Sequence, residues 1–132
     1  DAGLGCGRGV QFLKAHLKGD LHTSIIARLG RRSTRRICAR DPRWYSDTVS
    51  AICVPSGADA NAVVRAAYEN YGLSLGGGLS QLAGKVFRIG HLGDFNELML
   101  MGTLSGVEMG LKLANMPHRS GGVQVAMDFL AQ

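Results

Sequence analysis

The sequence lacks the features that mark secreted, membrane-bound or metal-binding proteins. Its three cysteines, Cys6, Cys38 and Cys53, are odd in number and widely spaced, so they form neither a CxxC pair nor a disulfide framework. No run approaches the ~20 apolar residues of a membrane span, and no signal-peptide pattern opens the chain. We therefore expect reduced thiols, a cytoplasmic location, no metal site and no membrane partner.

Aromatic residues are also scarce, at 6% of the chain, and this scarcity affects whether the net charge of +5 indicates nucleic-acid binding. Much of the basic excess lies in one arginine cluster: Arg28, Arg31, Arg32, Arg35, Arg36, Arg40 and Arg43. Nucleic-acid interfaces combine such clusters with stacking aromatic side chains or a recognisable module. Only Trp44 and Tyr45, at the end of the cluster, meet that description. We expect a solvated surface, and nucleic-acid binding is the weakest function left open.

What the sequence does have is the composition of one small globular domain. Its 132 residues are 45% hydrophobic and 19% charged, which are ordinary values. A chain of this size buries roughly two-thirds of its unfolded surface. The 19 glycines are about twice the usual share and indicate many turns. The chain begins at Asp1 rather than at a methionine, which suggests a fragment or a processed chain.

Residues 1–36 carry the weakest signals. The glycine-rich stretch Gly3–Gly9 has no preceding strand, which a phosphate-binding loop requires, so we expect a flexible terminus there. Apolar residues recur at helical spacing in Val10–Leu17 and in Leu21–Leu29. We interpret residues 1–36 as an atypical N-terminal segment that is helical in part.

From residue 37 onward, short strands alternate with amphipathic helices. Strands are expected at residues 37–40, 48–54, 73–75 and 86–89. Helices are expected from Asp59 to Gly72, from Asp94 or Asn96 to Pro117, and at residues 123–130. Cys38 and Cys53 would lie on neighbouring antiparallel strands, without assigned chemistry. This order predicts an α+β fold, a two-layer sandwich in which a small, mainly antiparallel sheet has helices packed on one face.

The apolar positions of the helices predict which faces pack. The first helix has its apolar face at Val63, Val64, Ala67, Tyr68 and Tyr71. The second has a stripe of Leu100, Leu104, Val107 and Leu111, widened by Leu98, Met101 and Met109. The last has Val123, Ala126, Met127 and Leu130. Small residues at Gly102, Gly106 and Gly110 form a second stripe along the middle helix, where we expect another element to approach closely.

Arg88 is the strongest candidate for function. Strand alternation directs Phe87 and Ile89 toward the core and leaves Arg88 with Val86 on the other face. A guanidinium held on a rigid strand offers a planar pair of donors that matches a carboxylate or a phosphate. The competing interpretation is a surface arginine paired with a nearby acid.

Gly76, Gly77 and Gly78 begin a loop that reaches Gly84, close to Arg88. Three successive glycines permit positive φ and a close backbone approach. Two interpretations remain open at this point: a flexible connection between the strands at 73–75 and 85–90, or the rim of a binding site.

Several segments resemble the class V pyridoxal-phosphate aminotransferases, above all the serine–glyoxylate and alanine–glyoxylate types. The resemblance is carried by Tyr71–Gly78 and Gly84–Gly93, with further similarity at Arg40–Ala51 and Asn96–Gly102. It covers roughly residues 37–132 and implies the C-terminal small domain of that family.

The resemblance implies a role for Arg88. It occupies the arginine position of the family's Lys-Val-x-Arg-Ile-Gly motif, which binds the α-carboxylate of the amino-acid or oxo-acid substrate. Gly76, Gly77 and Gly78 would form the rim of the same site. His91, three residues after Arg88, is expected to face it, although a loop histidine without an acid–base partner is more often structural.

The resemblance also implies pyridoxal phosphate in the intact enzyme, a glyoxylate-like substrate, a separate cofactor-binding large domain and a homodimer. None of Lys14, Lys18, Lys85 and Lys112 lies in a segment similar to the family's cofactor-lysine motif. We therefore assign no catalytic and no cofactor-binding residue, and expect the chain alone to bind no cofactor covalently and to be inactive. The alternatives are a non-catalytic module for a small anion or a protein partner and, more weakly, a nucleic-acid binder.

Overall fold

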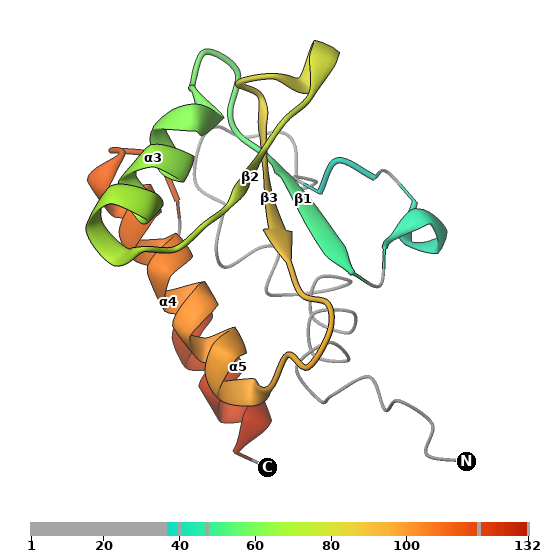
Figure 1. The fold of residues 1–132 in the computed structure, drawn as a ribbon, viewed down its shortest axis with the longest axis vertical. Helices are drawn as coiled ribbons and strands as arrows, with labels where there is room; N and C mark the ends of the chain where they lie inside the picture. Colours follow the sequence, from blue (N-terminus) through green and yellow to red (C-terminus); the bar gives the residue numbers. More distant parts are fainter. Residues whose placement is uncertain (1–36, 40, 47, 119, 132) are drawn as a thin grey trace.

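The structure, a computed structural model, describes residues 37–39, 41–46, 48–118 and 120–131 (Figure 1). Its elements, in chain order, are the 3-10 turn η1 (Pro42–Trp44), β1 (Val49–Cys53), α3 (Ala60–Tyr71), β2 (Gly76–Gly77), the 3-10 turn η2 (Ser80–Leu82), β3 (Val86–Gly90), α4 (Glu97–Leu113) and α5 (Gly122–Leu130). The helices expected at 10–17 and 21–29 lie outside the described residues, so the proposed boundary at residue 37 stays a prediction.

The described strands form one antiparallel sheet with β3 at its centre, in the order β1-β3-β2. Arg88 of β3 pairs with Ala51 of β1 on one side and with Gly76 of β2 on the other. Figure 1 shows α3, α4 and α5 gathered on one side of this sheet. The predicted α+β two-layer sandwich is confirmed.

Helix α3 begins and ends at the residues that the sequence predicts. The Asp59 side chain accepts a hydrogen bond from the Asn61 amide at 2.9 Å, and Gly72 ends the helix with a φ of 64°. The predicted apolar face is wrong at Tyr68 and Tyr71, which are exposed. The reason is that α3 packs through small residues, since Ala67 lies directly against α4 and leaves no space for a phenol ring.

Helix α4 begins after Asn96, whose side chain accepts from the Met99 amide at 3.0 Å. The predicted stripe of Leu100, Leu104, Val107 and Leu111 is buried. The wider stripe is wrong at Leu98 and Met109, which are exposed because a narrow leucine and valine face already fills the space under the sheet. In α5, Ala126 is buried, whereas Met127 is exposed.

Two predicted strands differ from the structure. In place of a strand at 37–40, the described residues there show a single bridge between Ile37 and Ile52. The strand predicted at 73–75 is wrong, because the residues that pair with β3 are Gly76 and Gly77. Leu73 instead completes the cap that follows α3, since its amide donates to the Ala67 carbonyl at 3.2 Å.

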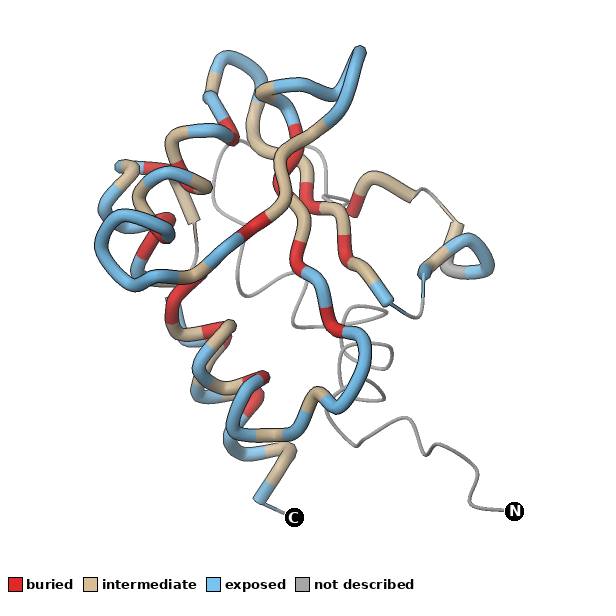
Figure 2. The backbone as a smooth tube through the Cα atoms, in the orientation of Figure 1, coloured by how far each residue is buried: buried red, intermediate tan, exposed pale blue. Residues whose placement is uncertain are grey.

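The core lies between the sheet and the helices. Ile52, Phe87 and Ile89 contribute from the strands, and Val63 and Leu100 are among the helical residues that meet them. Figure 2 shows the buried positions following β1 and β3 and continuing along the helices. No helix in the described part of the chain is long and apolar enough to cross a membrane.

Candidate functional site

Arg88 sits in the middle of the central strand, between two buried side chains. Phe87 and Ile89 are 1% and 3% exposed, and both belong to the core cluster. Arg88 itself is half-buried and points to the opposite face of the sheet, as strand alternation predicts. The core therefore holds the backbone from which the guanidinium projects.

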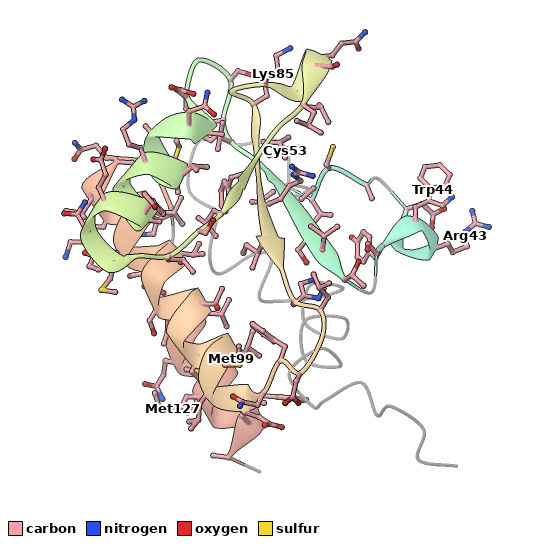
Figure 3. All side chains as sticks on the ribbon, viewed as in Figure 1. Arg43, Trp44, Cys53, Lys85, Met99 and Met127 are labelled. Carbon is pink, nitrogen blue, oxygen red and sulfur yellow. The ribbon has the colours of Figure 1, made fainter. Side chains whose placement is uncertain are left out.

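The guanidinium has one partner among the residues that the structure describes. Arg88 Nε donates a hydrogen bond of 2.9 Å to the Gly77 carbonyl oxygen. Within the described ranges its two terminal nitrogens make no hydrogen bond and no ion pair. Arg43 shows the contrasting case, because its Nη2 lies 2.6 Å from Asp41 Oδ2. Figure 3 shows Arg43 and Trp44 pointing away from the body of the fold. The interpretation of Arg88 as one half of a surface ion pair therefore has no support in this part of the chain.

The glycines beside Arg88 are required for space and not for unusual backbone angles. A Cβ added at Gly76 would lie 3.1 Å from Arg88 Nε and 3.3 Å from Nη2. A Cβ added at Gly78 would lie 2.0 Å from the Leu82 carbonyl oxygen. The three glycines permit positive φ but do not use it, and the nearest residues with positive φ are Gly72 and Ser80. Gly76 and Gly77 form strand β2 instead, so the segment is more ordered than a flexible loop.

His91 has different surroundings from Arg88. It is 1% exposed, and its Nε2 lies 3.0 Å from Ser50 Oγ in a buried contact. Its amide donates to the Thr48 carbonyl at 2.9 Å, which continues the pairing of β3 with β1. Position 91 shares the alternation of Ile89 and so lies on the core face. The structure joins Arg88 to Gly76 and Gly77, and it places His91 on the opposite side of the sheet.

Sequence reasoning missed both hydrogen-bond partners of the candidate residues. Neither the Gly77 carbonyl nor Ser50 is adjacent in sequence to the residue it contacts, so only strand register brings each pair together. A signal for the first was present, because glycine within a strand is typical of a position that another group approaches closely. The register itself is not encoded locally.

The two cysteines that the structure describes lie side by side on the sheet. Cys38 donates its amide to the Ala51 carbonyl at 3.0 Å, and Cys53 follows Ala51 by two residues on the same face. Burial, followed by the charge of Cys38 and a hydrogen bond with it, raises the pKa of the Cys53 thiol to about 11. Such a thiol is protonated and unreactive near neutral pH.

The described residues include two lysines and no cluster of metal ligands. Lys85 and Lys112 are both exposed, and Figure 3 shows Lys85 at the end of the sheet, next to the η2 turn. A Schiff-base lysine is instead expected within an enclosed site. No group of three or more histidine, cysteine or acidic side chains suited to a metal occurs in the described ranges.

Comparison with known proteins identifies relatives by sequence. The chain is 58% identical over 76 residues to serine–glyoxylate aminotransferase of Methylorubrum extorquens, covering 58% of this chain and 19% of that protein. It is 51% identical over 94 residues to the Arabidopsis thaliana serine–glyoxylate aminotransferase, covering 70% of this chain and 23% of that protein. It is 45% identical over 98 residues to L-aspartate–glyoxylate aminotransferase of Paracoccus denitrificans, covering 74% and 25%. No protein-family model matches the chain.

The fold agrees with the sequence. Pyridoxamine–pyruvate aminotransferase of Mesorhizobium loti superposes with a TM-score of 0.64 at 26% identity, covering 72% of this chain and 25% of that one. The resemblance to the class V aminotransferases is confirmed. Ureidoglycine–glyoxylate aminotransferase of Bacillus subtilis shares the fold, with a TM-score of 0.71 at 22% identity over 95% of this chain and 30% of that one. The chain spans only about a fifth to a quarter of the length of the curated class V aminotransferases that it matches.

Proposed function

We propose that residues 37–132 are the C-terminal small domain of a longer, pyridoxal-phosphate-dependent transaminase, in which Arg88 binds the carboxylate of the substrate. The observation that carries this proposal is the state of Arg88. A core strand holds its backbone, one hydrogen bond to Gly77 holds its Nε, and no described acid occupies its terminal nitrogens. An arginine in this state is ready to bind an external anion.

The substrate class follows from the relatives. Three of them are named for glyoxylate as one substrate, paired with serine or aspartate. Glyoxylate and small amino acids carry one carboxylate each, which two parallel N–H donors of a guanidinium bind in two-pronged fashion. Holding that carboxylate in one orientation supplies roughly several kcal/mol of a reaction barrier. We therefore propose small amino acids and glyoxylate-like 2-oxo acids as substrates.

The cofactor belongs, in this proposal, to the part of the longer protein beyond this chain. Bound pyridoxal phosphate would supply an electron sink for the substrate carbanion. The described lysines, Lys85 and Lys112, are exposed and do not fit a Schiff-base role. The contribution of this chain is to bind and orient the substrate, and the chain alone is inactive. The proposal extends to a cytoplasmic homodimer without membrane or nucleic-acid partners.

Substitution of Arg88 tests the proposal in the full-length enzyme. Arg88→Lys keeps the charge but loses the planar fork, so KM for the amino donor should rise at least about tenfold, or about 1.4 kcal/mol. Arg65→Lys, on an exposed position of α3, is the matched control and should leave KM unchanged. Steady-state kinetics with both variants decides the matter, and an unaltered KM in Arg88→Lys means that Arg88 does not bind substrate.

A second candidate function is a non-catalytic module that holds a small anion. It is favoured by the same availability of Arg88, which is present within this chain. Calorimetry of the chain with sodium glyoxylate and with inorganic phosphate separates the two, because such a module would bind without the remainder of the enzyme. Nucleic-acid binding gains no support, since Arg43, the one described member of the arginine cluster, is paired with Asp41.

A further inference from the structure

We infer that Gly76 is a positioning residue for Arg88: its lack of a side chain lets the guanidinium lie against strand β2, so that only the two terminal nitrogens are presented to an anion. The identity of that anion as a substrate carboxylate rests on the proposed function. The position of the guanidinium does not depend on the proposed function, and it can be measured separately.

The contact between the two residues follows from strand register. Gly76 is the direct partner of Arg88 across the β2–β3 pair, so a side chain at position 76 would leave the sheet on the same face as Arg88. The space that this side chain would need is already filled. An added Cβ would lie 3.1 Å from Nε, 3.3 Å from Nη2 and 3.3 Å from Cβ of Arg88.

The hydrogen bond to Gly77 depends on that close approach. Arg88 Nε reaches the Gly77 carbonyl at 2.9 Å only because the side chain runs flat over Gly76. A Cβ at position 76 would push the middle of the guanidinium away from β2, and the Nε–H donor would move with it. Glycine in the interior of a strand is unfavourable in itself, and its presence at such a position is typical of a close approach by another group.

The bond to Gly77 also selects the way in which an anion can bind. A guanidinium binds a carboxylate two-pronged either through Nε and one terminal nitrogen or through both terminal nitrogens. The Gly77 carbonyl occupies the Nε–H of Arg88, so the second mode remains. Fixing the side chain in advance also reduces the conformational entropy that would be lost on binding.

The adjacent glycine is a built-in comparison. A Cβ at Gly77 would point to the other face of β2, and the nearest atom to it is Asn61 Oδ1 at 3.6 Å, an ordinary contact. The carbonyl of residue 77 is unaffected by the identity of its side chain. Position 76 therefore fixes the guanidinium through the absence of a side chain, whereas position 77 fixes it through its backbone carbonyl.

The test is the solvent exchange of the Arg88 Nε–H proton, measured by nitrogen-15 NMR on the chain. In the unaltered chain this proton should exchange at least about tenfold more slowly than that of the exposed Arg65. The factor corresponds to the free energy of one hydrogen bond, which Arg88 Nε makes to Gly77. Gly76→Ala and Gly76→Val should abolish the difference while backbone amide protection in β1 and β3 is retained. Gly77→Ala should keep it, as should Gly102→Ala, whose added Cβ would meet nothing within 4 Å.

The outcomes separate this inference from the proposed function. Fast exchange of the Arg88 proton in the unaltered chain overturns the inference even if a position-76 variant fails to fold. Retained slow exchange in Gly76→Val also overturns it. The KM of the full-length Arg88→Lys enzyme tests the proposed function on its own. Slow exchange that Gly76→Ala abolishes, together with an unaltered KM in the full-length Arg88→Lys enzyme, supports the positioning role and counts against the carboxylate role.

Discussion

At the scale of single residues, Arg88 and His91 differ because of the parity of their positions. They are three residues apart on one extended segment, so strand alternation directs them to opposite faces of the sheet. Arg88 is half-buried and bound to a carbonyl, and His91 is 1% exposed and bound to Ser50. The expectation that both line one site overlooked this parity. His91 contacts Ser50 and Thr48 at the end of β3, so of the two residues only Arg88 remains a candidate for ligand binding under the proposed function.

The pKa of the Cys53 thiol tests how far the face of the sheet that carries Arg88 is buried. Its pKa is raised to about 11, with burial as the largest cause and Cys38 supplying the rest. Alkylation by iodoacetamide should therefore be slow at pH 8, compared with an ordinary thiol of pKa about 8.5, and should accelerate up to about pH 11. The raised pKa favours the protonated thiol in the folded state, so its contribution to stability is present at pH 8 and declines as pH rises through about 11.

Peptide mass mapping measures the rate at Cys53 separately from the other thiols. In Cys38→Ala the charge and the hydrogen bond of the neighbour are lost, so the pKa of Cys53 should fall and its alkylation at pH 9 should become faster. A rate at Cys53 that levels off below pH 9 in the unaltered chain contradicts the prediction.

At the scale of elements, small residues determine how closely the helices pack. Gly110 of α4 faces Ala67 of α3, and a Cβ added there would lie 3.2 Å from the Ala67 Cβ and 3.5 Å from its backbone. Gly106 packs against Leu73 in the same way. Gly102, one turn earlier, meets nothing within 4 Å. The predicted glycine stripe is therefore a packing surface at two of its three positions.

Two glycine-to-alanine substitutions in α4 should have opposite effects. Alanine at position 102 gains helix propensity without a new contact and should stabilise the fold by about 0.5–1 kcal/mol. Alanine at position 110 meets Ala67 and its backbone, and overpacking of about 1–3 kcal/mol should outweigh the gain. Urea denaturation gives both values. If Gly110→Ala is as stabilising as Gly102→Ala, the helices do not pack as closely as the structure indicates.

Helix α5 depends on a side chain of α4 for its N-terminal cap. The Glu108 carboxylate accepts hydrogen bonds from the Gly121 amide at 3.1 Å and from the Val123 amide at 3.4 Å. Gly121 has no side chain to supply this cap. A charged cap of this kind contributes about 1–2 kcal/mol.

Removal of that carboxylate should loosen α5 more than the rest of the fold. Glu108→Ala should lower the free energy of unfolding by about 1–2 kcal/mol and speed amide exchange in α5. Glu69→Ala, on an exposed position of α3, is the matched control. Equal stability of the two variants would mean that the cap contributes nothing.

At the scale of the whole molecule, the sheet separates a core from a second face. The helices cover one side, and the half-buried Arg88, Ala51 and Cys53 share the other. The relatives are about three times as long as this chain of 132 residues, since matches of 76–98 residues cover only 19–25% of them. We place the cofactor in that additional length, and this has a direct consequence for the chain by itself.

The chain alone should form no specific adduct with pyridoxal phosphate. Both described lysines are exposed and lack an enclosed site, so reduction with borohydride in the presence of the cofactor should give only sparse, unselective labelling. Intact-mass and peptide-mass analysis measures this, with a reaction lacking the cofactor as control. A stoichiometric adduct on one lysine would place cofactor chemistry within this chain and contradict the division proposed here.

Local features of the fold could be predicted from the sequence, because their causes lie within a few residues. Asp59 and Gly72 bound α3 through capping and a left-handed turn, and both depend only on neighbouring backbone. The stripe on α4 and the core positions of β3 follow from helical and strand periodicity. The candidate arginine was likewise identifiable, since alternation alone separates it from Phe87 and Ile89.

Contacts between distant segments were decided by the tertiary structure. The pairing of Gly76 with Arg88, the bond to the Gly77 carbonyl, the exposure of Tyr68 and the contact of His91 with Ser50 all depend on which segment lies opposite. Register and interhelical spacing come from the packing of the whole core, which no short stretch encodes. The sequence by itself therefore determined the caps, the periodic faces and the candidate arginine, and only the folded chain decided which distant segments lie against them.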